Sequence, residues 1–133
     1  MGAFIKNYDS RAEVILTACD FFSSDGQSLV HTEKAVWDTG STTTILSHRL
    51  IKDLNAVPFR KGGMTGIGGE VETETYLVHV APPTDDVITN VEVMAHDFED
   101  YEAIIGMDVI TYGDFEITNE GGKTRFSFRL TDK

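Results

Sequence analysis

Short runs in which apolar residues take alternate positions dominate this chain of 133 residues, and turn residues separate these runs. Val14, Leu16 and Ala18 alternate in the way that a half-buried strand requires. Residues 23–26, Ser-Ser-Asp-Gly, then predict a hairpin turn, because Gly26 adopts a positive φ without steric cost. The same pattern predicts further strands at residues 29–37, 71–80, 87–95, 114–118 and 124–130. In the last of these, Phe126, Phe128 and Leu130 share one face.

Two segments have helical character instead. Ser47 is a candidate N-cap, and Leu50, Ile51 and Leu54 follow it on one face. A shorter helix is predicted over residues 107–112, with a glycine just after it. The chain therefore reads as all-β with one or two short helices, and its closely spaced short strands favour a barrel or a sandwich. Its length fits one domain that spans residues 1–133.

Composition and charge exclude several functional classes. The chain is 41% hydrophobic and 25% charged, which is ordinary for a soluble globular protein, and its net charge is −11. Such a charge repels phosphate backbones and anionic membranes, so nucleic-acid binding is not expected. No apolar run approaches the ~20 residues of a membrane span, so no membrane insertion is expected. No secretory signal is recognised, and Cys19 is the single cysteine and is predicted to be buried, so the chain is expected to be cytoplasmic.

Candidate chemistry lies in residues 35–46, where an apolar strand leads into Asp38, Thr39, Gly40 and a run of hydroxyl residues. A carboxylate at a buried strand end is costly unless hydrogen-bond donors surround it. Backbone N–H groups and hydroxyls of the following residues can supply these donors, and Gly40 permits the tight turn that aims them inward. On these residues alone, a simple turn capped by Asp38 is an equally good interpretation.

Two later segments add to this picture. Residues 101–108 read Tyr-Glu-Ala-Ile-Ile-Gly-Met-Asp, and residues 61–69 are rich in glycine. The glycine-rich segment does not fit a phosphate-binding loop, because Val71 stands where a further glycine is needed and no Lys-Ser or Lys-Thr follows. A hairpin tip is the better interpretation. Other catalytic schemes also fail, since no Gly-x-Ser-x-Gly occurs and the four histidines stand singly.

The three segments, in this order and at this spacing, resemble the retropepsin-like (retroviral-type) aspartic protease family, and most closely its bacterial single-domain members. The resemblance covers roughly residues 12–112. It implies a closed acid-protease barrel with a flap hairpin, and an aspartic endopeptidase that acts as a homodimer on a peptide or protein substrate. Asp38, Thr39 and Gly40 correspond to the catalytic motif, with Thr39 bracing the two loops across the dimer axis. No metal or organic cofactor is implied.

The resemblance also suggests which residues contact a bound peptide, with the flap forming a mobile lid over it. The predicted substrate-binding residues are Ser41, Thr42, Thr65, Gly66, Ile67, Gly68 and Ile104. The hydroxyl of Ser41, where viral enzymes commonly have Ala, is expected near the carboxylates.

The sequence departs from the viral pattern at two places. Met107 stands where viral enzymes usually have Arg, and Thr42 and Thr43 occupy the stretch that often holds Asp. The ion pair that these residues form is therefore not expected here. A non-proteolytic peptide-binding or assembly domain with the same fold is the alternative function, although the intact Asp38-Thr39-Gly40 motif argues against it.

Overall fold

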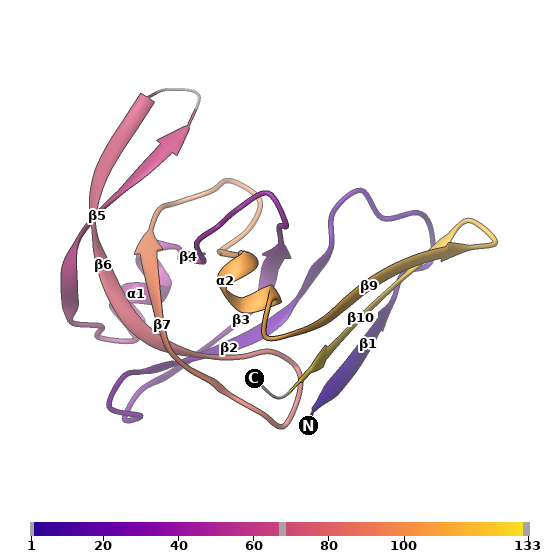
Figure 1. Ribbon diagram of the computed structural model, residues 1–133, viewed down its shortest axis with the longest axis horizontal. Coiled ribbons are helices and arrows are strands. Elements are labelled where there is room, and N and C mark those ends of the chain that lie inside the picture. The colour runs from indigo at the N-terminus through magenta and orange to yellow at the C-terminus, as the bar shows by residue number, and fades with distance from the viewer. Residues whose placement is uncertain (1, 67–68, 132–133) are drawn as a thin grey trace.

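The computed structural model describes residues 2–66 and 69–131 and consists mainly of a closed β-barrel (Figure 1). Hydrogen bonding runs in the strand order β2-β3-β8-β4-β7-β6, and β2 also pairs with β6, which closes the ring. Two of the pairings, β3 with β8 and β4 with β7, are parallel. The barrel strands are β2 (Leu16–Ser23), β3 (Leu29–Trp37), β4 (Ile45–Leu46), β6 (Gly69–Ala81), β7 (Ile88–Ala95) and β8 (Ala103–Ile105).

Alternation along β2 and β3 places one face of each strand in the core. In β2, Thr17, Cys19 and Phe21 are buried, whereas Leu16 and Ala18 are half-buried on the opposite face. Val14, which the sequence placed in the same strand, precedes β2 and is 53% exposed. The predicted strand is present, although it begins at Leu16. Its buried face carries Thr17, Cys19 and Phe21, and not the alternate residues that the sequence pattern singled out. Cys19 is buried, as expected.

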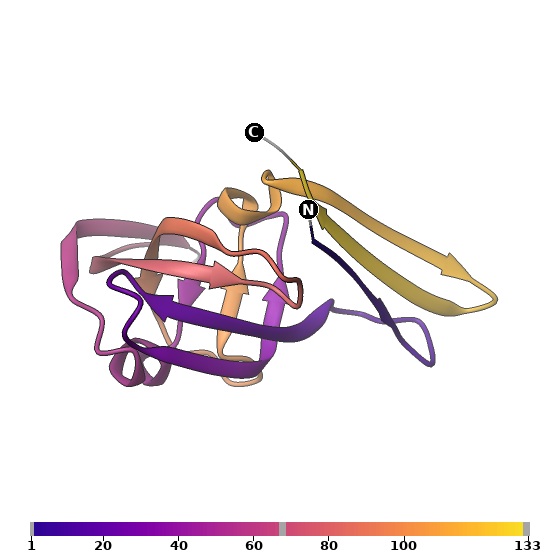
Figure 2. The same cartoon turned by 90° about the horizontal axis from the view of Figure 1, so that it is seen from below.

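A three-stranded sheet lies beside the barrel and contains both ends of the described chain. It has the order β1-β10-β9, formed by β1 (Ala3–Asn7), β10 (Lys123–Leu130) and β9 (Gly113–Glu120). Phe126 and Phe128 are fully buried and pack against the indole of Trp37, with ring centroids 5.1 and 4.8 Å away. The predicted apolar face of this strand is confirmed, and the tip of the β9–β10 hairpin projects away from the barrel (Figure 2).

Both predicted helices are present, although they are short. Helix α1 (His48–Asp53) begins at Ser47, whose hydroxyl accepts a hydrogen bond from the N–H of Leu50 at 3.3 Å, so the predicted N-cap is confirmed. Helix α2 (Met107–Ile110) ends two residues earlier than expected, with Thr111 as its C-cap. No helix in residues 2–66 and 69–131 is long and apolar enough to cross a bilayer.

Candidate active site

Asp38 follows β3 directly, at the point where the buried end of that strand leaves the barrel. Trp37 fixes the strand end, because its indole N–H donates to the hydroxyl of Thr17 at 2.9 Å and its side chain is buried. The N–H of Asp38 donates to the carbonyl oxygen of Ile105 at the end of β8 (2.9 Å). The position of the Asp38 main chain is therefore set by two central barrel strands, while its side chain remains half-buried.

The turn after Asp38 directs one backbone donor at the carboxylate. The N–H of Gly40 donates to Oδ1 of Asp38 at 2.8 Å, as the sequence led us to expect. The N–H of Ser41 donates instead to the carbonyl oxygen of Asp38 (3.2 Å), and the Ser41 hydroxyl donates to the carbonyl oxygen of Thr43 (2.7 Å). The sequence had suggested that the Ser41 hydroxyl lies beside the Asp38 carboxylate. In the structure this hydroxyl bonds to the backbone of Thr43 and stabilises the turn instead. Thr39 and Gly40 are exposed.

The segment 105–108 supports the other side of this turn. Gly106 approaches it so closely that an added Cβ would lie 2.8 Å from the carbonyl oxygen of Ser41 and 2.9 Å from the carbonyl carbon of Thr43. The N–H of Met107 donates to that Ser41 oxygen at 2.7 Å. We call residues 38–44 the catalytic loop, after the predicted catalytic aspartate with which it begins. A glycine is needed at position 106 because the backbone of this loop occupies the space of a side chain.

Thr44 and Asp108 complete this support, and sequence reasoning gave neither a role. The N–H and the hydroxyl of Thr44 both donate to the carboxylate of Asp108, at 2.9 and 2.7 Å. The two residues are 64 positions apart, so no local pattern could have paired them. Thr44 lies within residues 35–46 and Asp108 ends residues 101–108, so their place in these two segments was the one signal available.

A two-stranded hairpin faces the catalytic loop and corresponds to the predicted flap. It consists of β5 (Pro58–Gly66) and the first part of β6, paired antiparallel up to Gly66 and Gly69. It projects beyond the barrel at the upper left of Figure 1. Thr65 lies in β5 opposite Glu70. The predicted contacts Ile67 and Gly68 fall outside the described residues.

A pocket of about 380 Å³ lies between the catalytic loop and Gly63 of the hairpin. It brings together two predicted substrate-binding residues, Ser41 and Thr42, with several that the sequence did not indicate. Its lining residues are Gly40, Ser41, Thr42, Thr43, Ile45, Gly63 and Met94. Ile104 does not line it and is only 9% exposed, in register with Val36 and Ile45 in the neighbouring strands. In this single chain, Ile104 therefore offers little surface to a ligand.

An adjoining pocket of about 310 Å³ shares Thr43 and Met94 with the first and has a charged wall. Arg60 donates from Nε and Nη2 to the two carboxylate oxygens of Glu92, at 2.6 and 2.7 Å. The Arg60 guanidinium, together with the hydroxyl of Thr75, holds the pKa of the Glu92 carboxyl below its usual range. The paired charges thus form one wall of this second pocket.

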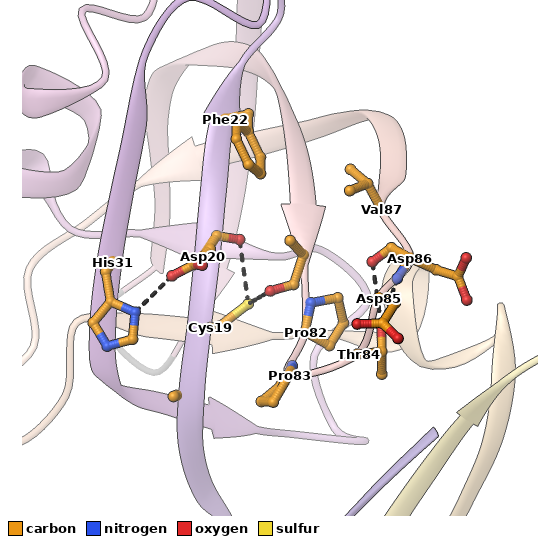
Figure 3. Close-up of a pocket in the computed structure, with 12 residues that line it drawn as sticks. Cys19, Asp20, Phe22, His31, Pro82, Pro83, Thr84, Asp85, Asp86 and Val87 are labelled. Carbon is orange, nitrogen blue, oxygen red and sulfur yellow. Dashed lines mark hydrogen bonds and ion pairs between the residues drawn. The ribbon is translucent and has the colours of Figure 1, made fainter. Parts of the chain in front are cut away.

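A third pocket, of about 330 Å³, lies apart from these, between β2 and the turn that joins β6 to β7 (Figure 3). Asp20 contacts His31 at its edge (2.6 Å), and Asp20 and Glu33 together raise the pKa of His31. None of its lining residues belongs to the catalytic loop or to the flap hairpin. No cluster of His, Cys, Asp and Glu suited to a metal ion occurs in the described part of the chain.

Comparison with known proteins supports the fold. No protein-family model and no curated protein sequence matches the chain. Among solved structures, it is similar to EIAV protease in complex with the inhibitor HBY-793, with a TM-score of 0.55 and 22% identity over 74% of this chain and 86% of that one. It is also similar to a retropepsin-like aspartic protease from Rickettsia conorii, with a TM-score of 0.53 and 10% identity over 98% of this chain and 97% of that one. The chain has the fold of the retropepsin-like aspartic proteases, as its sequence motifs had indicated.

Proposed function

We propose that the protein is an aspartic endopeptidase that acts as a homodimer. The observation that carries the proposal is the position of Asp38, which is half-buried, is held by the Gly40 N–H, and directly precedes the turn residues Gly40, Ser41 and Thr42 that line the pocket facing the hairpin. The chain contains a single Asp-Thr-Gly motif, so a second carboxylate has to come from a second copy. Thr39 is exposed beside Asp38, where it is free to contact that copy.

The proposed mechanism uses the two copies of Asp38 as a proton-sharing pair. Two carboxylates at contact distance cannot both ionise cheaply, and aspartic-protease dyads share one proton for this reason. The ionised member removes a proton from a bound water, whose oxygen attacks the scissile carbonyl carbon. The protonated member donates to the carbonyl oxygen, and proton transfer to the amide nitrogen then allows the amine to leave.

An extended peptide fits the cleft between the catalytic loop and the flap hairpin. Strand edges bind such peptides through main-chain hydrogen bonds, while alternate side chains enter pockets. The pocket beside Ser41 and Thr42 and the adjoining pocket beside Arg60 would take neighbouring side chains. The glycines of the flap tip, Gly66 and Gly68, would let it close over the substrate, with Ile67 as the covering residue.

Incubation with a peptide library tests this proposal. We expect cleavage that pepstatin, a transition-state inhibitor, suppresses. Cleavage should also show a specific activity that rises with protein concentration, because the pair forms only in the dimer. Because each chain carries −11 at neutral pH, association should be easier below neutral pH. A protein that binds library peptides without cleaving them at any concentration would instead support the peptide-binding alternative.

A further inference from the structure

We propose that Asp108 is a positioning residue for the catalytic loop: its carboxylate holds Thr44 and thereby fixes the orientation of Asp38. This inference rests on the proposed function for its kinetic consequences, whereas its structural part stands on the hydrogen bonds alone. Gly40 and Ser41 line the pocket between the catalytic loop and the hairpin, whereas Thr44 and Asp108 do not. We therefore assign Thr44 and Asp108 no direct part in the chemistry.

The contact is specific, because both carboxylate oxygens are used on one residue. Oδ2 of Asp108 accepts the backbone N–H of Thr44 at 2.9 Å, and Oδ1 accepts the Thr44 hydroxyl at 2.7 Å. Thr44 is fully buried. Hydrogen bonds to an ionised acceptor are shorter and stronger than those between neutral groups. Two such bonds at a buried position fix both the backbone and the χ1 angle of Thr44.

Thr44 also makes hydrogen bonds to Gly106 and to β7. Its hydroxyl oxygen accepts the N–H of Gly106 at 3.2 Å while its proton points to Asp108. The carbonyl oxygen of Thr44 accepts the N–H of Met94 from β7 at 3.2 Å. The hydroxyl therefore lies at the centre of a network that joins the catalytic loop to the end of β8 and the start of α2.

The whole catalytic loop is attached at three places to one short segment, residues 105–108. Asp38 donates to Ile105 at its start, Ser41 accepts from Met107 in its middle, and Thr44 donates to Asp108 at its end. Asp108 is the one residue of this segment that attaches to the loop through its own side chain. Substitution can remove it without changing the backbone pattern, which makes it the attachment that mutagenesis can test.

Loss of the Asp108 carboxylate should loosen the loop and misplace Asp38. A displacement of about 1 Å in a catalytic group can lower the rate about 10²-fold. We therefore expect Asp108→Ala to lower kcat roughly 10²-fold, while KM changes less than about 3-fold because the pockets remain. Asp108→Asn should recover at least about 10-fold of that loss, since its amide oxygen can accept the Thr44 N–H and its NH₂ can donate to the Thr44 hydroxyl.

Asp25, in the turn between β2 and β3, offers a matched control. Its Oδ1 also accepts one hydroxyl, from Ser23 at 2.7 Å, and one backbone N–H, from Gln27 at 2.9 Å. This arrangement stabilises only the β2–β3 turn. Asp25→Ala should leave kcat and KM at parental values. This control shows whether an effect of Asp108→Ala is specific to Asp108 or follows from the loss of any carboxylate that accepts two such hydrogen bonds.

The decisive experiment combines kinetics with amide hydrogen exchange in the parent, Asp108→Ala, Asp108→Asn and Asp25→Ala proteins. The inference predicts faster exchange at the Gly40, Ser41 and Thr44 amides in Asp108→Ala, by about 10-fold or more, and parental rates in Asp25→Ala. A folded Asp108→Ala with parental kcat or parental exchange overturns it. If Asp108→Ala does not fold, Thr44→Val decides in the same way, with Thr44→Ser as its control; it removes the bonds of the hydroxyl to Asp108 and to the Gly106 N–H and keeps the bond of the Thr44 N–H to Asp108.

Failure of the proposed function is recognised separately. If the parent cleaves no peptide, the endopeptidase proposal is wrong, and exchange at the three loop amides still decides whether Asp108 positions the loop. Accelerated exchange confined to the Asp108 variants then supports the structural role, and unchanged exchange overturns it.

Discussion

The catalytic loop and the flap hairpin, which face each other across the cleft, are held in opposite ways. The loop bonds to two barrel strands, through Ile105 of β8 and Met94 of β7, and to the start of α2, through Met107 and Asp108. The hairpin is a two-stranded ribbon, since β5 pairs with β6 and ends the sheet order. The catalytic loop, which we call the floor, is thus held by several tertiary hydrogen bonds. The hairpin, which we call the cover, is held mainly by the pairing of β5 with β6.

This difference matches what each part has to do in the proposed reaction. A general base must keep its position to within a fraction of an ångström, and rigid elements supply that precision. A cover must open and close, and segments with few buried contacts do so at low cost. If the proposed function holds, one fold provides a fixed carboxylate and an adaptable lid within a single chain of 133 residues.

Glycine shows the same contrast at single positions. Gly106 is required by crowding, since the catalytic loop lies within 2.9 Å of where its Cβ would be. Gly69, in the hairpin, has open space around it, and its φ of +103° is the reason for a glycine. The first glycine allows close packing, and the second allows a backbone conformation.

The largest effect is expected at Asp38. Asp38→Asn keeps an oxygen that can accept the Gly40 N–H, so the loop should fold normally, but it removes the general base and the shared proton. We expect peptide hydrolysis to fall about 10³-fold or more, with a melting temperature close to that of the parent. Hydrolysis at the parental rate would contradict the mechanism.

Replacement of Gly106 by Ala tests the fixed side of the comparison. The added methyl has no space, because the atoms it meets belong to the backbone of the catalytic loop. We expect a loss of about 1–3 kcal/mol in the free energy of unfolding, together with a large loss of turnover. Denaturant unfolding and peptide kinetics measure the two. Parental stability would show that the loop is not held as tightly as its contacts indicate.

Replacement of Gly68 by Val tests the adaptable side. A β-branched residue at the predicted flap tip should hinder closure and lower kcat/KM by about 10-fold or more, while the free energy of unfolding changes by less than about 1 kcal/mol. Thermal melts and steady-state kinetics separate the two quantities. If stability and turnover fell together in this variant as in Gly106→Ala, the contrast between floor and cover would be lost.

The smallest effect concerns the end of β8 farthest from the catalytic loop. Arg49 lowers the pKa of the Glu102 carboxyl, which also accepts the Thr32 hydroxyl at 2.6 Å. A lowered pKa means that this contribution to stability is present above the usual pKa of the carboxyl and is lost as pH falls through the folded value. Because Glu102 is 27% exposed, we expect about 1 kcal/mol or less at neutral pH.

Thermal melts of the parent and Glu102→Gln across pH measure this contribution. The difference in melting temperature should shrink as the pH is lowered past the usual pKa of a glutamate carboxyl and through the lower pKa of Glu102 in the folded protein. A difference that stays constant with pH would mean that packing, and not charge, accounts for the effect.

The sequence predicted most of the longer elements because their patterns are local. The alternation in β3 and β10, the Ser47 cap and the Asp38 motif all lie within a few neighbouring residues. It did not predict β4 and β8, since strands of two and three residues are too short to show a period. Nor did it pair Thr44 with Asp108, because only the folded barrel brings positions that far apart into contact.

The central claim, that each active site uses Asp38 from two chains, is tested most directly by mixing chains. Parent and Asp38→Asn proteins are combined at fixed total concentration, allowed to exchange subunits, and assayed for peptide hydrolysis. If a site needs both aspartates, activity follows the square of the parent fraction, so an equal mixture retains about one quarter of the parental activity. Activity that falls in direct proportion to the parent fraction, to about one half, would contradict the shared site.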